Sequence, residues 1–251
     1  MISQLNRRLG SELIKLRHLH LLPIILGINI LAFFLGSLLY FENQNVFKAY
    51  HTQWFALWSE VGLFYAQVFF PLLIALIVAA TINSEKERKN FLRMAIVPIS
   101  AKKLVINKLL SLMVLSALSL ICFMALFYMT AFTAHLPINT NITNFFLWGI
   151  LGWLGTFPIV AIQLWLSIKF ERFTTPIIVA LGASLLSFIL MTMNESFLKV
   201  YPYSQIMVGM HVRTVTQFSI SELMVFLVID IMFTGLGMFW SVRNLKKRGF
   251  E

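Results

Sequence analysis

Asp230 is the only aspartate in the chain, and it stands in the middle of a long apolar run. A carboxylate at the centre of a membrane helix costs about 2.5–3.5 kcal/mol on insertion scales, so it is expected to be paired, protonated, or facing water or protein. Asn29 lies at a similar depth in another run and is a candidate partner. Asp230 is therefore either a substrate-path, proton-relay or gating residue, or a structural hydrogen-bonding group. The lack of a second charge for a relay favours the structural interpretation.

The chain lacks the motifs of common ATP-dependent and metal-dependent enzymes. No Gly-Lys pair occurs, which excludes a G-x-x-x-x-G-K-[ST] phosphate-binding loop, so we do not expect this chain to hydrolyse ATP. There is no H-E-x-x-H sequence, and the five histidines show no metal-ligand spacing. We predict a protein that is not an enzyme, with no catalytic residues, no metal site and no cofactor of its own.

The composition indicates a membrane protein. Hydrophobic residues make up 59% of the 251 residues and charged residues 12%, whereas soluble domains average about 45–50% and about 25%. So little polar surface cannot cover a soluble globule. One cysteine, Cys122, excludes an intrachain disulfide.

Six stretches have the roughly 20 mostly apolar residues that a membrane-crossing helix needs. The sequence thus predicts one all-α membrane domain over residues 1–251, with spans near 21–41, 62–82, 109–132, 145–168, 175–193 and 223–242. Pro71 and Pro158 predict kinks in the second and fourth spans.

The basic residues orient these spans. Of the 20 Lys and Arg, 17 fall in the N-terminal arm, the second and fourth connections and the C-terminal tail, and three in the other connections. The positive-inside rule places the 17 in the cytoplasm, and both termini with them. The net charge of +10 is thus mainly a topology signal and gives no support to nucleic-acid binding.

The N-terminal arm, residues 1–20, has the pattern of an amphipathic helix, with leucines at helical spacing among charged residues. Such a helix lies in the cytoplasmic interface, near anionic lipid headgroups. It is either an elbow that moves with the bundle or a simple anchor.

The connection over residues 83–108 is the most informative cytoplasmic segment. Ser84 and Glu87 fit a capping box, which predicts that a new helix starts there. Pro98 ends this short helix, and Ser100 can cap the next one. Apolar Phe91, Leu92 and Met94 stand among its charges, so the helix either dips into lipid or inserts into a soluble partner.

Two connections on the opposite side are rich in aromatic residues. The first, residues 42–61, contains Trp54, Phe55 and Trp58 and predicts an interfacial helix. The last, residues 194–221, is half apolar and predicts a re-entrant or interfacial hairpin.

A basic amphipathic arm, six spans, and the pattern Glu85…Asn90-Phe91…Pro98-Ile99-Ser100…Lys102…Lys108-Leu109 together resemble the membrane subunits of ABC-2-type exporters. The chain is most similar to the lantibiotic-immunity permeases of Gram-positive bacteria, which have about this length. The topological resemblance covers nearly the whole chain, and its sharpest part lies within residues 83–108.

The resemblance implies a multi-pass permease of the bacterial cytoplasmic membrane that expels a lantibiotic-type antimicrobial peptide. It implies a second permease, identical or paralogous, and two copies of a separate ABC ATPase that uses ATP and Mg. The residues of the coupling helix that would dock on the ATPase are Glu85, Glu87, Arg88, Phe91, Leu92 and Met94. The outer aromatic residues would either contact the peptide or anchor the interface; these are Trp54, Trp58, Tyr201 and Tyr203.

Three alternatives remain at this point. The chain is an ABC-2 permease for a drug, a lipid or a polysaccharide, or a membrane anchor or sensor that recruits a soluble partner, or a channel or proton-coupled carrier centred on Asp230. Co-purification of an ATPase that has no spans of its own separates the first from the other two.

Overall fold

The computed structural model describes residues 21–87, 100–137, 142–193 and 195–248, and every regular element among them is helical. Six helical segments in the described part are long and apolar enough to cross a membrane, which confirms the predicted number of spans. Their bounds are Leu21–Glu42, Gln53–Glu87, Ala101–Thr133, Thr143–Lys169, Thr174–Met193 and Ile220–Lys246. The predicted elbow helix lies outside the described residues.

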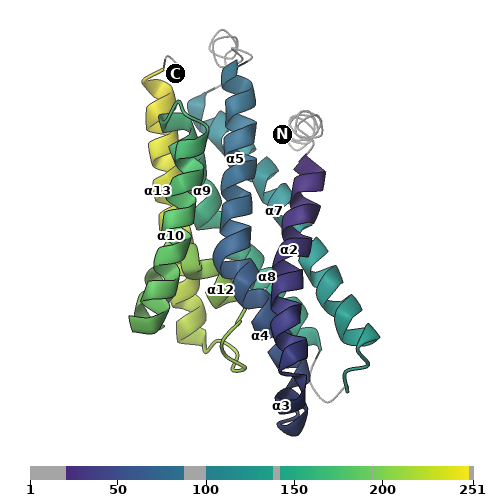
Figure 1. Cartoon of the computed structure of the whole chain (residues 1–251). Coiled ribbons are helices and arrows are strands. Elements are labelled where there is room, and N and C mark those ends of the chain that lie inside the picture. The colour runs from purple at the N-terminus through teal and green to yellow at the C-terminus, as the bar shows by residue number, and fades with distance from the viewer. Residues whose placement is uncertain (1–20, 88–99, 138–141, 194, 249–251) are drawn as a thin grey trace.

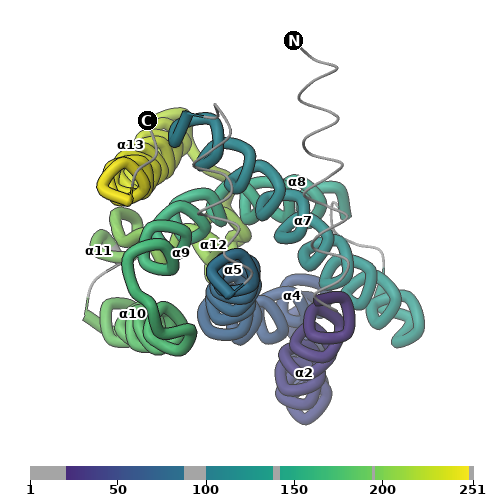
Figure 2. Tube along the Cα trace, turned by 90° about the horizontal axis from the view of Figure 1, so that it is seen from above, coloured from purple at the N-terminus to yellow at the C-terminus, as the bar shows by residue number. Residues whose placement is uncertain are grey.

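The helices run side by side in one bundle (Figures 1 and 2). Helices α2 (Leu21–Glu42) and α4 (Gln53–Phe64) lie on one side. Helices α9 (Phe157–Lys169), α10 (Thr174–Met193) and α13 (Ile220–Lys246) lie on the other, and α5 (Phe70–Glu87) stands between the groups. The long helix α7 (Ala101–Thr133) runs obliquely behind α5. Helix α2 begins and α13 ends at the same end of the bundle, as an even number of spans requires.

Two glycines set the closest helix contacts of these groups. A Cβ atom added to Gly36 of α2 would lie 2.4 Å from the Cα atom of Val61 in α4. A Cβ atom added to Gly237 of α13 would lie 2.6 Å from the carbonyl carbon of Ala161 in α9. Only glycine allows backbones to approach this closely, which is how small residues stabilise helix packing in membranes.

The second span begins nine residues earlier than the sequence predicts. After the short helix α3 (Gln44–Ala49), α4 continues directly through a π-helical turn, η1 (Tyr65–Phe69), into α5. Pro71 explains the wide turn, because its ring would clash with the carbonyl group of Gln67 in a regular α-helix. The prediction that Trp54, Phe55 and Trp58 form a separate interfacial helix is therefore wrong: they lie in α4, which is continuous with the second span, and both tryptophans are fully buried.

The fourth span is broken where Pro158 predicts a kink. Helix α8 (Thr143–Leu154) ends at Gly155, and α9 starts at Phe157 with the proline in its first turn. A proline is tolerated in the first turn because its missing N–H would have no intrahelical partner there.

The predicted hairpin over residues 194–221 folds back against this break. It contains α11 (Glu195–Val200), the short 3₁₀ turn η2 (Pro202–Ser204) and α12 (Gln205–Gly209). A Cβ atom added to Gly155 would lie 2.5 Å from the carbonyl oxygen of Gln205, and one added to Gly209 would lie 2.6 Å from that of Leu151. The segment is thus packed into the bundle.

The connection between the second and third spans differs from the prediction at its start. No helix begins at Ser84: α5 runs through to Glu87, and the Ser84 hydroxyl group donates to the Thr81 carbonyl oxygen at 2.9 Å. Ser84 therefore has an intrahelical partner where the capping box requires a helix end. Helix α7 does begin after Ser100, whose backbone is extended, although its side chain makes no capping hydrogen bond.

Candidate functional site

A buried ion pair joins the two helices that flank residues 88–99. The Lys108 ammonium group on α7 donates to the Glu85 carboxylate on α5, and each residue is only 3% exposed. Breaking a buried pair by removing one partner typically costs about 3–5 kcal/mol. The pair therefore holds the last turn of α5 against the second turn of α7.

A second cluster ties this end of α5 to the ends of α9 and α13. The Lys86 ammonium group donates to the carbonyl oxygens of Ser167 at 2.8 Å and Phe170 at 2.6 Å, which close the C-terminus of α9. It also lies 3.8 Å from the Glu171 carboxylate, to which Arg248 donates from the other side. A cation beside the last carbonyls of a helix is favoured by the helix dipole.

The charges around Glu171 control its ionisation. Partial desolvation raises the pKa of its carboxyl group, but the hydrogen bond from Arg248 and the positive charges of Lys86 and Arg248 together lower the pKa below its usual value. Glu171 therefore stays ionised and holds the ends of three helices together through Lys86 and Arg248.

The predicted coupling residues are divided by the structure. Glu85 faces Lys108 inside the bundle, whereas Glu87 is exposed and accepts a hydrogen bond from the Asn83 side chain at 2.7 Å. Four others lie outside the described residues: Arg88, Phe91, Leu92 and Met94. Lys108 was not predicted as the partner of Glu85. Its signal in the sequence is a cation close to the apolar residues Ile106 and Leu109 of a predicted helix, because a lysine on an apolar face is rarely buried unless it is paired.

Asp230 and Asn29 are not brought together. Asn29 on α2 donates to the Ile25 carbonyl oxygen and to the Ser119 hydroxyl oxygen, both at 2.8 Å. Helix α13, which carries Asp230, lies in the other group of helices (Figure 2). The predicted pairing is therefore wrong, because periodicity gives the depth of each residue but not which helices are neighbours.

Asp230 instead lines a lateral groove of about 380 Å³ beside the break between α8 and α9. The residue is 5% exposed, and neither of its carboxylate oxygens has a hydrogen-bond partner within the described part of the chain. Thr234, one turn further along α13, lines the same groove, and its hydroxyl group also has no partner there.

The four aromatic residues proposed to meet a peptide have different environments. Trp54 and Trp58 are fully buried, and their indole N–H groups donate to the carbonyl oxygens of Pro137 at 3.0 Å and Met210 at 2.8 Å. Tyr203 is 4% exposed and accepts a hydrogen bond from the Gln163 side chain at 2.7 Å. Tyr201 is half-buried, so it keeps the most accessible surface of the four.

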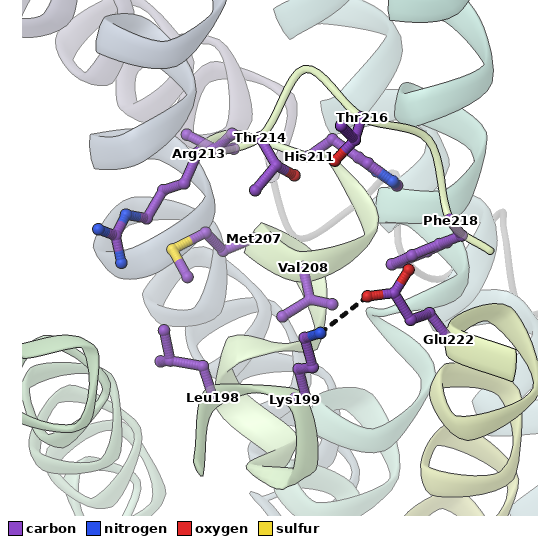
Figure 3. Close-up of a pocket in the computed structure, with 11 residues that line it drawn as sticks. Leu198, Lys199, Met207, Val208, His211, Arg213, Thr214, Thr216, Phe218 and Glu222 are labelled. Atoms are coloured by element: carbon purple, nitrogen blue, oxygen red, sulfur yellow. Dashed lines mark hydrogen bonds and ion pairs between the residues drawn. The ribbon is translucent and has the colours of Figure 1, made fainter. Parts of the chain in front are cut away.

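A separate pocket of about 220 Å³ lies between α12 and the start of α13 (Figure 3). Lys199 and Glu222 form an ion pair of 2.9 Å at its edge. His211 packs flat against Trp148, with its Nδ1 atom 2.9 Å from the Gly209 carbonyl oxygen. Desolvation lowers the pKa of the His211 imidazole, although the Gly209 carbonyl and Glu222 partly oppose the shift. The pocket thus holds a neutral imidazole next to a paired acid and base.

Comparison with known protein families decides the class. The family described as ABC-2 family transporter protein matches residues 9–189. The chain belongs to this family. No curated protein shows significant similarity to it. Membership makes the chain a membrane permease of an ABC transporter and implies association with an ABC ATPase subunit.

The ion pair lies inside the residues that the family match covers, whereas Asp230 lies outside them. The match includes Glu85 and Lys108 and the whole connection between them, so the ion pair lies in the part shared with the family. It ends within α10, before the hairpin of residues 195–219 and before Asp230. The groove beside Asp230 therefore lies partly in a region for which the family match carries no information.

Proposed function

We propose that this permease is the membrane subunit of an exporter, and that its ATPase docks on residues 83–108. The buried pair of Glu85 and Lys108 carries the proposal. Because the pair holds α5 against α7 at the base of the connection, a displacement of the docked segment moves both helices together. Exposed Glu87 and the apolar residues Phe91, Leu92 and Met94 would form the contact, and Arg88 would add a charge.

In this proposal the end of the bundle with Glu171 and Arg248 faces the cytoplasm, and both termini lie there. The distribution of 17 basic residues in the cytoplasmic segments supports this orientation. The ATPase, which supplies ATP hydrolysis with Mg, is a separate soluble subunit in two copies. The second permease is an identical or paralogous chain.

The proposed cargo is a lantibiotic-type antimicrobial peptide, expelled from the producer's own bacterial cytoplasmic membrane. The resemblance to lantibiotic-immunity permeases in length and topology supports this. ATP binding would close the two ATPase subunits, and the coupling segments would transmit the motion to the bundle. The peptide would then leave from the outer leaflet.

Co-purification with the ATPase tests the docking step. The double variant Phe91→Asp/Leu92→Asp is expected to insert normally and to lose most of the bound ATPase, because two carboxylates replace the apolar contact. The matched control is Val46→Asp/Tyr50→Asp, which changes an exposed residue of α3 and the exposed residue that follows it, at the opposite end of the bundle, and should retain the ATPase. Wild-type yield of ATPase with the first variant would show that docking occurs elsewhere.

Cell-associated peptide tests the cargo. Cells that express the permease with its ATPase are exposed to a fluorescent lantibiotic, and the reference cells carry an ATPase that cannot hydrolyse ATP. Active transport is expected to lower the peptide bound to the membrane. Equal labelling of the two cell types, with ATPase docking intact, would contradict the lantibiotic cargo and leave the permease function standing.

A further inference from the structure

The groove beside Asp230 is built from apolar walls around one polar point. Its apolar lining includes Leu154 and Phe157 from the two sides of the α8–α9 break and Leu227, Ile231 and Met238 from α13. Ile231 is 71% exposed, so the groove opens sideways from the bundle, toward the surface that lipid covers in a spanning helix. A molecule can therefore enter it from within the membrane.

The two polar side chains of the groove have no partner in the described protein. Both carboxylate oxygens of Asp230 and the Thr234 hydroxyl group are buried without a hydrogen bond. Buried polar groups in native structures are nearly always satisfied, because leaving them unpaired costs free energy. An occupant that donates hydrogen bonds would satisfy all three oxygen atoms.

The charge of the groove defines that occupant further. Among the described residues, none that lines it is Lys, Arg or His. Phe157, the first residue of α9, lines it, so the N-terminus of that helix borders the groove. A carboxylate in an apolar groove that lacks a cation of its own is complementary to a positively charged group on an apolar tail.

We propose that this groove binds the ammonium group of a cationic amphiphile from the membrane. Asp230 and Thr234 accept hydrogen bonds from the ammonium group, and the apolar walls hold the tail. This names the chemical class of the cargo and rests on the proposed export function for its biological role. A symmetric pairing of two permeases through this groove is disfavoured, because it would bring two unpaired Asp230 carboxylates together.

Gly235 offers a steric test that leaves the carboxylate in place. A Cβ atom added there meets no atom within 4 Å, so a side chain can be added without a clash at the backbone, and a leucine is expected to occupy the groove. Gly182 of α10 has the same open surroundings and is not among the residues that line the groove. Gly182→Leu is therefore the matched control for Gly235→Leu.

The experiment measures binding of a pyrene-tailed dodecylamine to the full chain in nanodiscs of zwitterionic lipid, without any ATPase. A pyrene-tailed dodecanol is the neutral reference. Wild-type protein is expected to bind the amine at least about tenfold more tightly than the alcohol, as expected for a charged hydrogen-bonded pair. Asp230→Asn should remove that preference and Asp230→Glu should keep most of it, while Gly235→Leu should weaken both probes and Gly182→Leu neither.

Three results would overturn the proposal. They are equal affinity of the wild type for amine and alcohol, unchanged amine binding by Asp230→Asn, and a change of oligomeric state by Gly235→Leu without any amine binding by the wild type. The last result would assign the groove to a second copy of the chain. If Asp230→Asn does not fold, the two leucine variants still decide the question. Because no ATPase is present, a failure of docking on residues 83–108 leaves this test unaffected.

Discussion

Lys108 of α7 donates to the carboxylate of Glu85 of α5, and both side chains are excluded from solvent at the base of the connection between their helices. Neither residue is placed to meet an ATPase directly. Their contribution to coupling is to keep the two attached helices in one fixed arrangement.

Removing the cation of this pair should destabilise the bundle. Lys108→Met is expected to lower the free energy of unfolding by about 3–5 kcal/mol, because the buried Glu85 carboxylate loses its ion pair with the Lys108 ammonium group. Thermal unfolding in nanodiscs, followed by tryptophan fluorescence, measures the change.

The control for this prediction removes both charges. Glu85→Leu/Lys108→Met should unfold close to the wild type, because apolar residues of similar volume often replace a buried pair without loss. A single variant as stable as the wild type, or a double variant as unstable as the single, would show that the pair does not hold α5 and α7 together.

Gly36 should be intolerant of the smallest side chain. Gly36→Ala places a methyl group 2.4 Å from the Val61 Cα atom, so α2 and α4 must move apart, at a cost of about 1–3 kcal/mol or more. Gly27→Ala on the same helix meets no atom within 4 Å and should be nearly neutral. Unfolding of both variants in mixed detergent micelles compares them, and equal stability would contradict the close contact.

Acidification should weaken the hairpin of residues 195–219 through His211. Desolvation lowers the pKa of this buried imidazole, so the unfolded chain binds its proton at a higher pH than the folded chain does. The wild type should therefore lose stability as the pH falls from about 7.5 through the usual histidine range near 6.5. His211→Asn removes the titrating group and keeps a residue that tolerates the backbone φ of 50°. Parallel pH profiles of the two proteins would exclude His211 as the cause.

Cysteine labelling should report the orientation of the bundle. Cys122 is first changed to serine, and a single cysteine is placed either at Val46 in α3 or at Lys247 after α13, both of which are exposed. A membrane-impermeant maleimide applied to intact cells should label Val46→Cys, and should label Lys247→Cys only after the membrane is opened. The reverse pattern would place the termini outside.

The six spans and the break at Pro158 could be predicted because length, hydropathy and proline act locally. The start of α7 after Ser100 could be predicted for the same reason, since a helix start depends on a few consecutive residues. Ser84 shows the limit of such local signals. Its capping pattern is present, but the hydrogen bonds of α5 continue through it and no helix end forms there.

The environments of Asp230 and Trp58 could not be predicted, because they depend on which helices become neighbours. Trp58 lies in a segment whose aromatic residues suit an interface, yet the hairpin of residues 195–219 folds back, and its Met210 carbonyl oxygen accepts a hydrogen bond from the Trp58 indole. Asp230 and Asn29 have similar positions within their predicted spans, but the bundle separates α2 from α13. Hydropathy along the chain predicts neither the partner of Trp58 nor the separation of these two helices.

The π-helical turn at Tyr65–Phe69 also sets the rotational phase of the second span. Each residue of an α-helix turns the chain by about 100°. The additional residue in the π-helical turn therefore rotates the faces of α4 with respect to those of α5. The indole rings of Trp54 and Trp58 precede the turn, whereas Glu85 follows it. Aromatic packing at one end of the span and ion pairing at the other are thus aligned by a single extra residue.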